Sequence, residues 1–328
     1  MNELVVILIG LALIFDFLNG VHDSSNIVAT IISSRSLSPR WALGFTAIAE
    51  FCGPFLFGVA VARTIGSEIV PPGLMTFPIL TSALTGAIIW NLLTWYLGVP
   101  SSSSHALIGG LIGATTAGVG FHVIHLSGLT KVLISLFLSP ILGLVAGFIF
   151  TRLVYWLSRS ATIKINVFFK RVQVITGMAL ALSHGANDAQ KTMGLITLGL
   201  FVNGTISSFT VPVWVILISA LAIALGTVSG GWRLIKTLGA GFFRIRPVHG
   251  FCTQVTAAGV ILGAALFGGP VSTTQVVSST IMGVGAAERV NKVRWHLAGN
   301  ILAAWLITIP LSGLMAAGVL QILRIFGI

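Results

Sequence analysis

The chain has 328 residues, of which 55% are hydrophobic and 8% are charged, and its mean hydropathy is +1.03. A soluble domain averages about 25% charged residues, so this composition excludes an ordinary soluble protein and predicts an all-α polytopic membrane protein. The formal net charge is +11. In a membrane protein such charge orients the chain, and we expect no nucleic-acid partner, the lipid bilayer being the surrounding medium.

Apolar segments suited to membrane helices follow one another along almost the whole chain. A helix needs about 20 apolar residues to cross the hydrocarbon core. Gly20 and Gly185 lie among polar residues inside two of these segments, and we expect local unwinding there, giving discontinuous helices. The predicted segments, in chain order, are 4–34, 41–62, 78–98, 101–118, 132–156, 172–202, 211–230, 248–269, 271–287 and 296–326.

The basic residues divide between the two sides of the predicted membrane. Fourteen lie in one set of loops, including Arg35 and Arg171, whereas the other set holds only Arg63, Lys131 and Arg324. Cytoplasmic loops carry the excess of Lys and Arg, so the fourteen are expected in the cytoplasm. The sequence therefore predicts a multi-pass protein of the plasma (inner) membrane with both termini outside.

The sequence contains a hidden repeat. A shift of 165 residues places NGVHDSSN on HGANDAQK and Asp23 on Asp188, and a shift of 170 places GVPSSSSH on GGPVSTTQ. The first copy starts outside and the second inside, which predicts two inverted-topology repeats, 1–160 and 161–328, as in many secondary transporters. Segments 78–98 and 101–118 form one predicted helical hairpin, and 248–269 and 271–287 form its mirror image.

Ionisable residues occupy the middle of two apolar segments. Asp23 and Asn26 in the first copy match Asp188 and Lys191 in the second, each pair three residues apart. A charge at the bilayer centre costs about 3 kcal/mol on insertion scales, so such groups face a cavity or each other. The duplication favours a shared functional role over an Asp188–Lys191 ion pair that only ties helices together.

The two hairpin tips, PSSSSH and PVSTTQ, combine proline with clustered hydroxyls. This is a helix-start pattern, and a helix N-terminus offers free N–H groups to an anion. Two such tips meeting near the midplane would form a cage of donors; the alternative is that the hydroxyls only cap helices. The candidate substrate contacts are Ser101, Ser102, Ser103, Ser104, Ser272, Thr273, Thr274 and Gln275.

Glu50 is a carboxylate ten residues into an apolar segment. A buried acid is either protonated or close to a cation. We therefore predict a coupling-ion or proton site at Glu50, against the alternative of a buried neutral acid.

The motifs NGVHDSSN, IIWNLLTWYLGVPSSSSHALIG and LSHGANDAQKTMGLI resemble the inorganic phosphate transporter (PiT) family, in its compact bacterial branch. The resemblance covers essentially the whole chain. It implies a secondary transporter, not an enzyme, that moves inorganic phosphate by symport with protons or sodium. It also implies substrate and ion contacts at Asp23, Asn26, Asp188, Ser103, Ser104, Thr273, Thr274 and Gln275.

The sequence departs from the sodium-coupled branch, in which both copies read close to G-A-N-D-V-A-N. Here His22 precedes Asp23, while Asn187 precedes Asp188 and Lys191 stands where an asparagine would be. Coupling to H+ is therefore expected, with Na+ as the alternative, and His22, Asn26, Glu50, Asn187 and Lys191 are the candidate coupling-ion residues. We expect no cofactor and no resident metal, and a homo-oligomer is left open.

Two rival functions use the same features. A sulfate transporter could share the scaffold, but sulfate has no proton to donate to a buried carboxylate, so paired aspartates favour phosphate. An intramembrane aspartyl protease could use two membrane aspartates that share a proton. Peptide hydrolysis, however, gives no reason for an inverted repeat with two hydroxyl-rich tips.

The topology can be tested with single cysteines introduced at Ser38 and Ser127 in a variant that lacks Cys52 and Cys252. Because the two positions are predicted on opposite faces of the membrane, an impermeant thiol reagent should label them from opposite sides. Labelling from the same side would contradict the inverted repeat.

Overall fold

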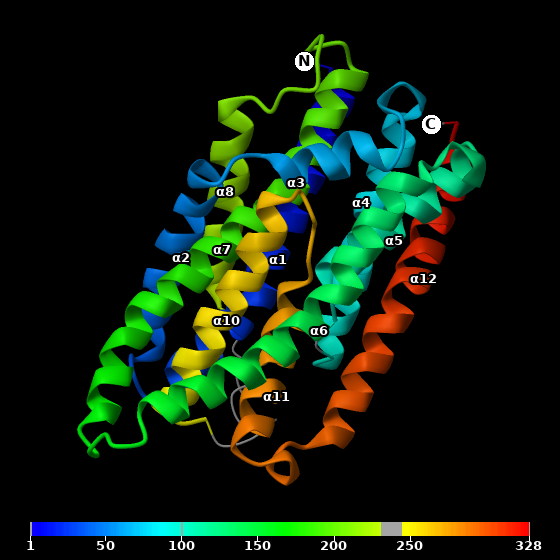
Figure 1. Ribbon diagram of the computed structural model, residues 1–328. Coiled ribbons are helices and arrows are strands. Elements are labelled where there is room, and N and C mark those ends of the chain that lie inside the picture. Colours follow the sequence, from blue (N-terminus) through cyan, green and yellow to red (C-terminus); the bar gives the residue numbers. More distant parts are fainter. Residues whose placement is uncertain (1, 100, 231–244, 328) are drawn as a thin grey trace.

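The computed structural model describes residues 2–99, 101–230 and 245–327, and this part of the chain is helical with no strand (Figure 1). Both termini lie at the same end of the bundle. The principal helices are α1 (Glu3–Ser33), α2 (Pro39–Leu56), α3 (Ala60–Arg63), α4 (Phe77–Leu97), α5 (Ser103–Gly118), α6 (Leu126–Leu157), α7 (Ile165–Val202), α8 (Val213–Ser229), α10 (Pro247–Leu266), α11 (Thr273–Glu288) and α12 (Trp295–Ile325).

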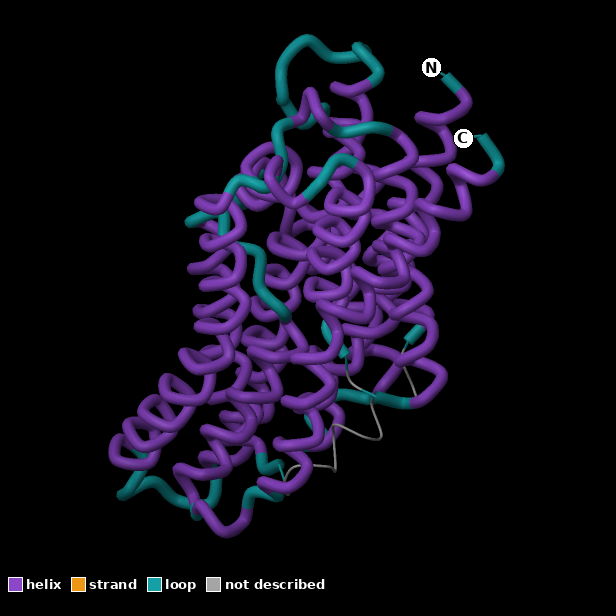
Figure 2. The backbone as a smooth tube through the Cα atoms, turned by 90° about the vertical axis from the view of Figure 1, so that its right-hand side faces the viewer, coloured by secondary structure: helices purple, strands orange, loops and turns teal. Residues whose placement is uncertain are grey.

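These helices confirm the predicted multi-pass membrane protein. Among the described residues, 6 helices are long and apolar enough to cross a membrane, or up to 7 if the bent segment formed by α2 and residues 60–68 is one span. They run alongside one another in a long bundle, with loops mainly at its two ends (Figure 2). Helices α5 and α11 have 16 residues each. At 1.5 Å per residue each is about 24 Å long, shorter than a hydrocarbon core of about 30 Å.

The expected interruptions at Gly20 and Gly185 are wrong. Helices α1 and α7 continue through both positions. The glycines instead allow helices to cross at backbone distance: a Cβ on Gly20 would collide with the carbonyl oxygen of Ile223, and one on Gly185 with that of Glu50. Chain breaks occur elsewhere, in the 71° bend between α2 and residues 60–68 and at the tips between α4 and α5 and between α10 and α11.

Helix packing has the pattern that two related halves would give. Helix α1 packs on α8 and α7 packs on α2, while α5 packs on α12 and α11 packs on α6. Exchanging the two halves of the chain converts each pair into the other. The glycine contacts repeat as well, because a Cβ on Gly53 would meet the carbonyl of Leu182 and one on Gly226 that of Phe17. The inverted repeat over 1–160 and 161–328 stays a prediction that this pattern supports.

Replacing Gly20 by alanine should destabilise the fold, because the new methyl group would collide with backbone atoms that cannot rotate away. Overpacking of this kind costs about 1–3 kcal/mol. The melting temperature of purified protein in detergent should fall for Gly20→Ala. The matched control is Gly10→Ala in the same helix, where a Cβ has nothing within 4 Å. Equal melting temperatures for the two variants would contradict the close crossing.

Candidate functional site

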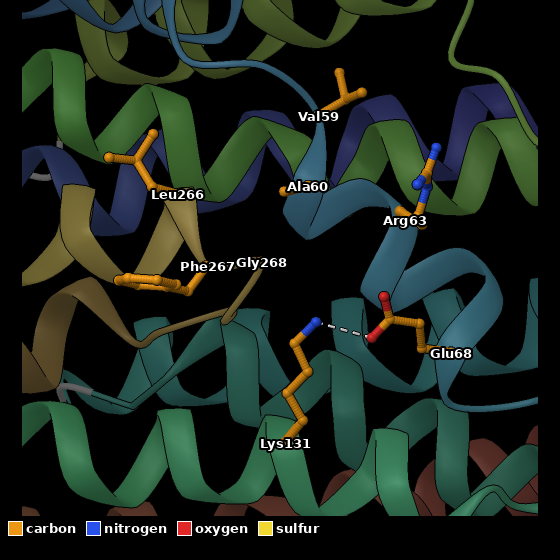
Figure 3. A pocket seen from close by; sticks show the side chains of 8 residues that line it. All are labelled: Val59, Ala60, Arg63, Glu68, Lys131, Leu266, Phe267 and Gly268. Carbon is orange, nitrogen blue, oxygen red and sulfur yellow. Dashed lines mark hydrogen bonds and ion pairs between the residues drawn. The ribbon is translucent and has the colours of Figure 1, made fainter.

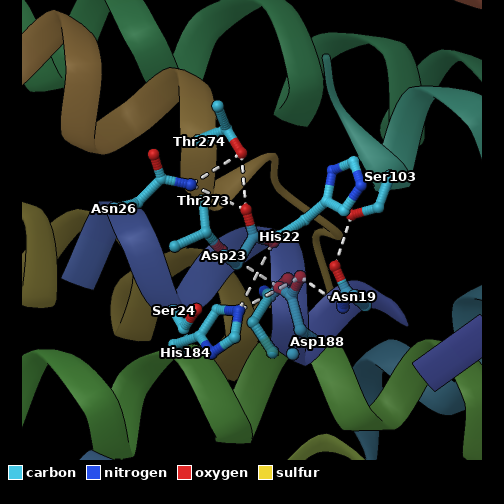
Figure 4. Close-up of polar contacts among 12 residues, drawn as sticks. Asn19, His22, Asp23, Ser24, Asn26, Ser103, His184, Asp188, Thr273 and Thr274 are labelled. Carbon is cyan, nitrogen blue, oxygen red and sulfur yellow. Dashed lines mark hydrogen bonds and ion pairs between the residues drawn. The ribbon is translucent and has the colours of Figure 1, made fainter. Parts of the chain in front are cut away.

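The site forms where the middle parts of α1 and α7 meet the two hairpin tips. The tips touch each other: the Ser104 hydroxyl donates to the Val271 carbonyl at 2.8 Å. Figure 4 shows side chains of α1, α7 and both tips converging on one buried cluster. Asp23 is 2% exposed and Asp188 is completely buried. The aspartates predicted to work together therefore share one site.

Asp188 is the most heavily contacted group of the cluster. Its Oδ1 accepts from Thr273 Oγ1 at 3.1 Å and lies 2.8 Å from Lys191 Nζ, and its Oδ2 accepts from Asn19 Nδ2 at 3.0 Å. The side-chain oxygen Oδ1 of Asn19 in turn accepts a hydrogen bond from the Ser103 hydroxyl at 2.5 Å. Both tips thus reach this one carboxylate, one directly and the other through Asn19.

Asp23 accepts hydrogen bonds from the same second tip and from its own helix. Its Oδ1 accepts from Thr274 Oγ1 at 2.5 Å and from Asn26 Nδ2 at 2.7 Å, and Asn26 also donates to Thr274 at 2.9 Å. The predicted residues Asp23, Asn26 and Thr274 therefore form one hydrogen-bonded group.

His184 joins the two aspartates to Glu50, and the sequence analysis did not select it. Its Nδ1 lies 2.8 Å from Glu50 Oε1, and its Nε2 lies 3.5 Å from Asp23 Oδ2 and 3.6 Å from Asp188 Oδ2. Glu50 is held from its other side by the Thr227 hydroxyl. The i, i+4 spacing of His184 and Asp188 was a signal for this contact. Glu50, a predicted coupling-ion residue, is therefore linked to both aspartates through His184.

Several predicted residues hold the tips in place. Ser102 and Ser272 cap α5 and α11, accepting from the backbone N–H of His105 and Gln275 at 3.1 and 3.4 Å. Ser101 shares a hydrogen bond of 2.7 Å with Thr94 on α4. The observed contacts of Ser102 and Ser272 are those of helix caps, the alternative to substrate binding.

The remaining predicted positions lie around the cluster. Asn187 accepts from Val271 N and donates to the Gly269 carbonyl, both at 3.1 Å, so it secures the second tip. Gln275 Nε2 lies 3.3 Å from His105 Nε2, and His22 is buried at the edge of the cluster. These contacts place Asn187, Gln275 and His22 next to the aspartate site without a direct bond to either carboxylate.

Asp16 is a second residue that the sequence analysis did not select. It is fully buried on α1, where its carboxylate faces Thr192 on α7. Its electrostatic neighbours are Asp188, Lys191 and His184 on α7. Its spacing of seven residues before Asp23 places it two turns away on the same face of α1, which was the available signal.

The geometry suits an anion that can also donate protons. Lysine and hydroxyl groups supply donors, while Asp23 and Asp188 supply acceptors inside a water-poor region where such bonds are strong. An all-helical membrane protein in which two half-helix tips meet duplicated aspartates has the architecture of a secondary transporter.

Sequence comparison identifies the family of this protein. The model of the phosphate transporter family matches residues 19–316, and the chain belongs to this family. A probable low-affinity inorganic phosphate transporter of Rhizobium meliloti is 46% identical over 316 residues, covering 96% of this chain and 95% of the relative. The corresponding protein of Bacillus subtilis is 43% identical over 318 residues, again covering 96% and 95%.

The fold has a solved counterpart. A structure described as the sodium-dependent phosphate transporter superimposes with a TM-score of 0.88, covering 99% of this chain and 100% of that chain, at 24% sequence identity. The agreement establishes the fold over the whole described length. The predicted family and the predicted all-α multi-pass fold are confirmed, and the named relatives are transporters, not enzymes.

Proposed function

We propose that the protein imports inorganic phosphate across the plasma (inner) membrane by symport with protons, with both termini outside. Alternating access would rock the two halves, 1–160 and 161–328, around the aspartate cluster. The observation that carries this proposal is the meeting of Asp23, Asp188 and both hydroxyl-rich tips in one buried site. The sodium-coupled alternative comes from the solved neighbour, whose title describes sodium dependence.

The acceptors in the site favour phosphate over sulfate. A protonated phosphate can donate a hydrogen bond to Asp23 or Asp188 and accept bonds from Ser103, Ser104 or Lys191. Sulfate has no proton at neutral pH and would be repelled by the carboxylates. Recognition of a substrate O–H by a buried acceptor gives strong discrimination, because the analogue without it leaves that acceptor unpaired.

Uptake of radiolabelled phosphate into vesicles tests the substrate and the site together. Excess sulfate should leave uptake unchanged. Asp23→Asn and Asp188→Asn should each abolish uptake while expression stays near normal, because an amide cannot accept with the charge of a carboxylate. Strong competition by sulfate would favour a sulfate transporter, and normal uptake in either variant would refute the assignment of the central site.

Lys191 supports proton coupling. Its ammonium lies 2.8 Å from Asp188 and donates to the Ser104 hydroxyl at 2.6 Å and to the Val271 carbonyl at 3.0 Å. It is 1% exposed, so its side chain does not extend to the membrane surface. All three N–H donors are thus used inside the protein.

The repeat assigns Lys191 a counterpart. A shift of 165 relates it to Asn26, which contacts Asp23 and Thr274, the equivalents of Asp188 and Ser104. An asparagine oxygen can coordinate a cation, whereas an ammonium can only replace one. We infer that Lys191 supplies, next to Asp188, the positive charge that sodium supplies in sodium-dependent relatives. The loss of one cation site to this tethered charge favours protons over sodium as the coupling ion.

Uptake measured at constant membrane potential, with sodium and pH varied separately, tests the coupling ion. We expect uptake to depend on pH, with at most one sodium ion retained near Asn26. Lys191→Ala should change the pH dependence, because Asp188 then lacks its tethered positive charge.

Two outcomes would rule out this role of Lys191. One is sodium-dependent and pH-independent uptake by the native protein, and the other is an unchanged pH profile in Lys191→Ala. Neither outcome would affect the assignment of phosphate as the substrate, which the aspartate variants test independently.

A further inference from the structure

A cationic cavity lies away from the aspartate cluster, between residues 59–68, α6 and the end of α10. Its volume is about 380 Å³ and its lining includes Arg63, Glu68, Lys131 and Phe267. Figure 3 shows Lys131 and Glu68 facing each other across this space. Lys131 Nζ lies 2.9 Å from Glu68 Oε2 and donates to Thr64 at 3.0 Å. One lysine N–H remains for a ligand, since an ammonium has three donors.

The cavity keeps a net positive charge after this pairing. Glu68 balances one cation, and the Arg63 guanidinium at the rim makes no ion pair with any other described residue. A second polar cavity of about 420 Å³ adjoins it and shares Glu68 and Lys131, with His125 and Ser127 in its lining. The region therefore suits a polar, negatively charged group larger than a single ion.

An apolar groove begins at the same lysine. It has a volume of about 530 Å³, runs between α6 and α10, and shares Lys131 and Phe267 with the cationic cavity. The rest of its lining is mainly apolar, including Leu138, Leu142 and Val260. Leu138 and Leu142 are 45% and 48% exposed, so the groove opens toward the hydrocarbon of the bilayer.

Two glycines create this groove. Gly259 and Gly263 lie one turn apart on α10, and a Cβ on either would have nothing within 4 Å. Glycine is less favourable than alanine in a helix, and in membrane helices small residues normally let another helix approach. At these two positions no described residue makes use of the space, which leaves room for an acyl chain.

We propose that the groove and the cationic cavity together bind one anionic phospholipid. Its acyl chain lies along Gly259 and Gly263, and its phosphate contacts Lys131, with Arg63 at the rim. Leu266 and Phe267 at the mouth are 57% and 84% exposed, so a ligand enters from the membrane rather than from open water. This favours a lipid over free phosphate, although both carry a phosphoryl anion.

The site lies against the second hairpin tip. Gly268 lines the cationic cavity and Gly269 lines the groove. Gly269 also accepts a hydrogen bond from Asn187, which holds the tip on α7. The bound lipid therefore contacts the segment that separates it from the aspartate cluster.

Native mass spectrometry of the full protein, after reconstitution in vesicles of phosphatidylcholine and phosphatidylglycerol, tests the proposal. Bound phosphatidylglycerol should fall about fivefold in Lys131→Gln, the effect expected for one basic contact with an anionic lipid. Glu68→Gln should raise it by releasing Lys131. Gly263→Leu should also lower it by filling the groove, while leaving every charge in place.

Matched controls separate the site from general effects. Arg159→Gln removes a cation that lies over Trp156, outside both cavities, and Gly44→Leu fills open space on α2. Both should retain phosphatidylglycerol like the native protein. Equal retention in all variants would overturn the proposal. So would a Lys131→Gln variant that binds less radiolabelled inorganic phosphate, in an Asp188→Asn background, while retaining phosphatidylglycerol normally.

Discussion

The structure depends on buried polar groups that satisfy one another where water is scarce. A carboxylate in the hydrocarbon region is costly unless donors surround it or a proton neutralises it. Asp188 has its donors from three places, Lys191 on its own helix, Asn19 on α1 and Thr273 on a hairpin tip. These bonds set the depth to which the tip enters the bundle, because only one position brings its hydroxyl to the carboxylate.

These hydrogen bonds require helices that cross at short distance. Side chains as short as serine, threonine and aspartate span only a few ångströms, so the helices that carry them must lie near one another. Gly20 and Gly185 provide this proximity by removing Cβ atoms where α1 meets α8 and where α7 meets α2. The same crossings bring Thr227 and Glu50 beside the centre of the site.

The sequence predicted the helices and the paired aspartates because apolar length and duplicated polar motifs are local signals. It did not determine what Gly20 and Gly185 do, since a glycine that permits unwinding and one that permits close packing look the same in a sequence. His184 and Asp16 were missed for another reason. Their importance depends on which residues of distant helices face them, and spacing along one helix gives only the shared face.

A tethered cation has a thermodynamic consequence. A sodium ion that enters with substrate is released inside, and its movement through a potential of 100 mV yields about 2.3 kcal/mol. In the role proposed above, Lys191 stays attached to α7 and its charge adds no such work, so the work of uptake comes from the proton that crosses with phosphate. A carrier in which a lysine replaces one sodium ion therefore sustains a ratio of inside to outside phosphate concentration that is about 50-fold smaller at this potential. In return, such a carrier needs no sodium ion at the position that the lysine occupies.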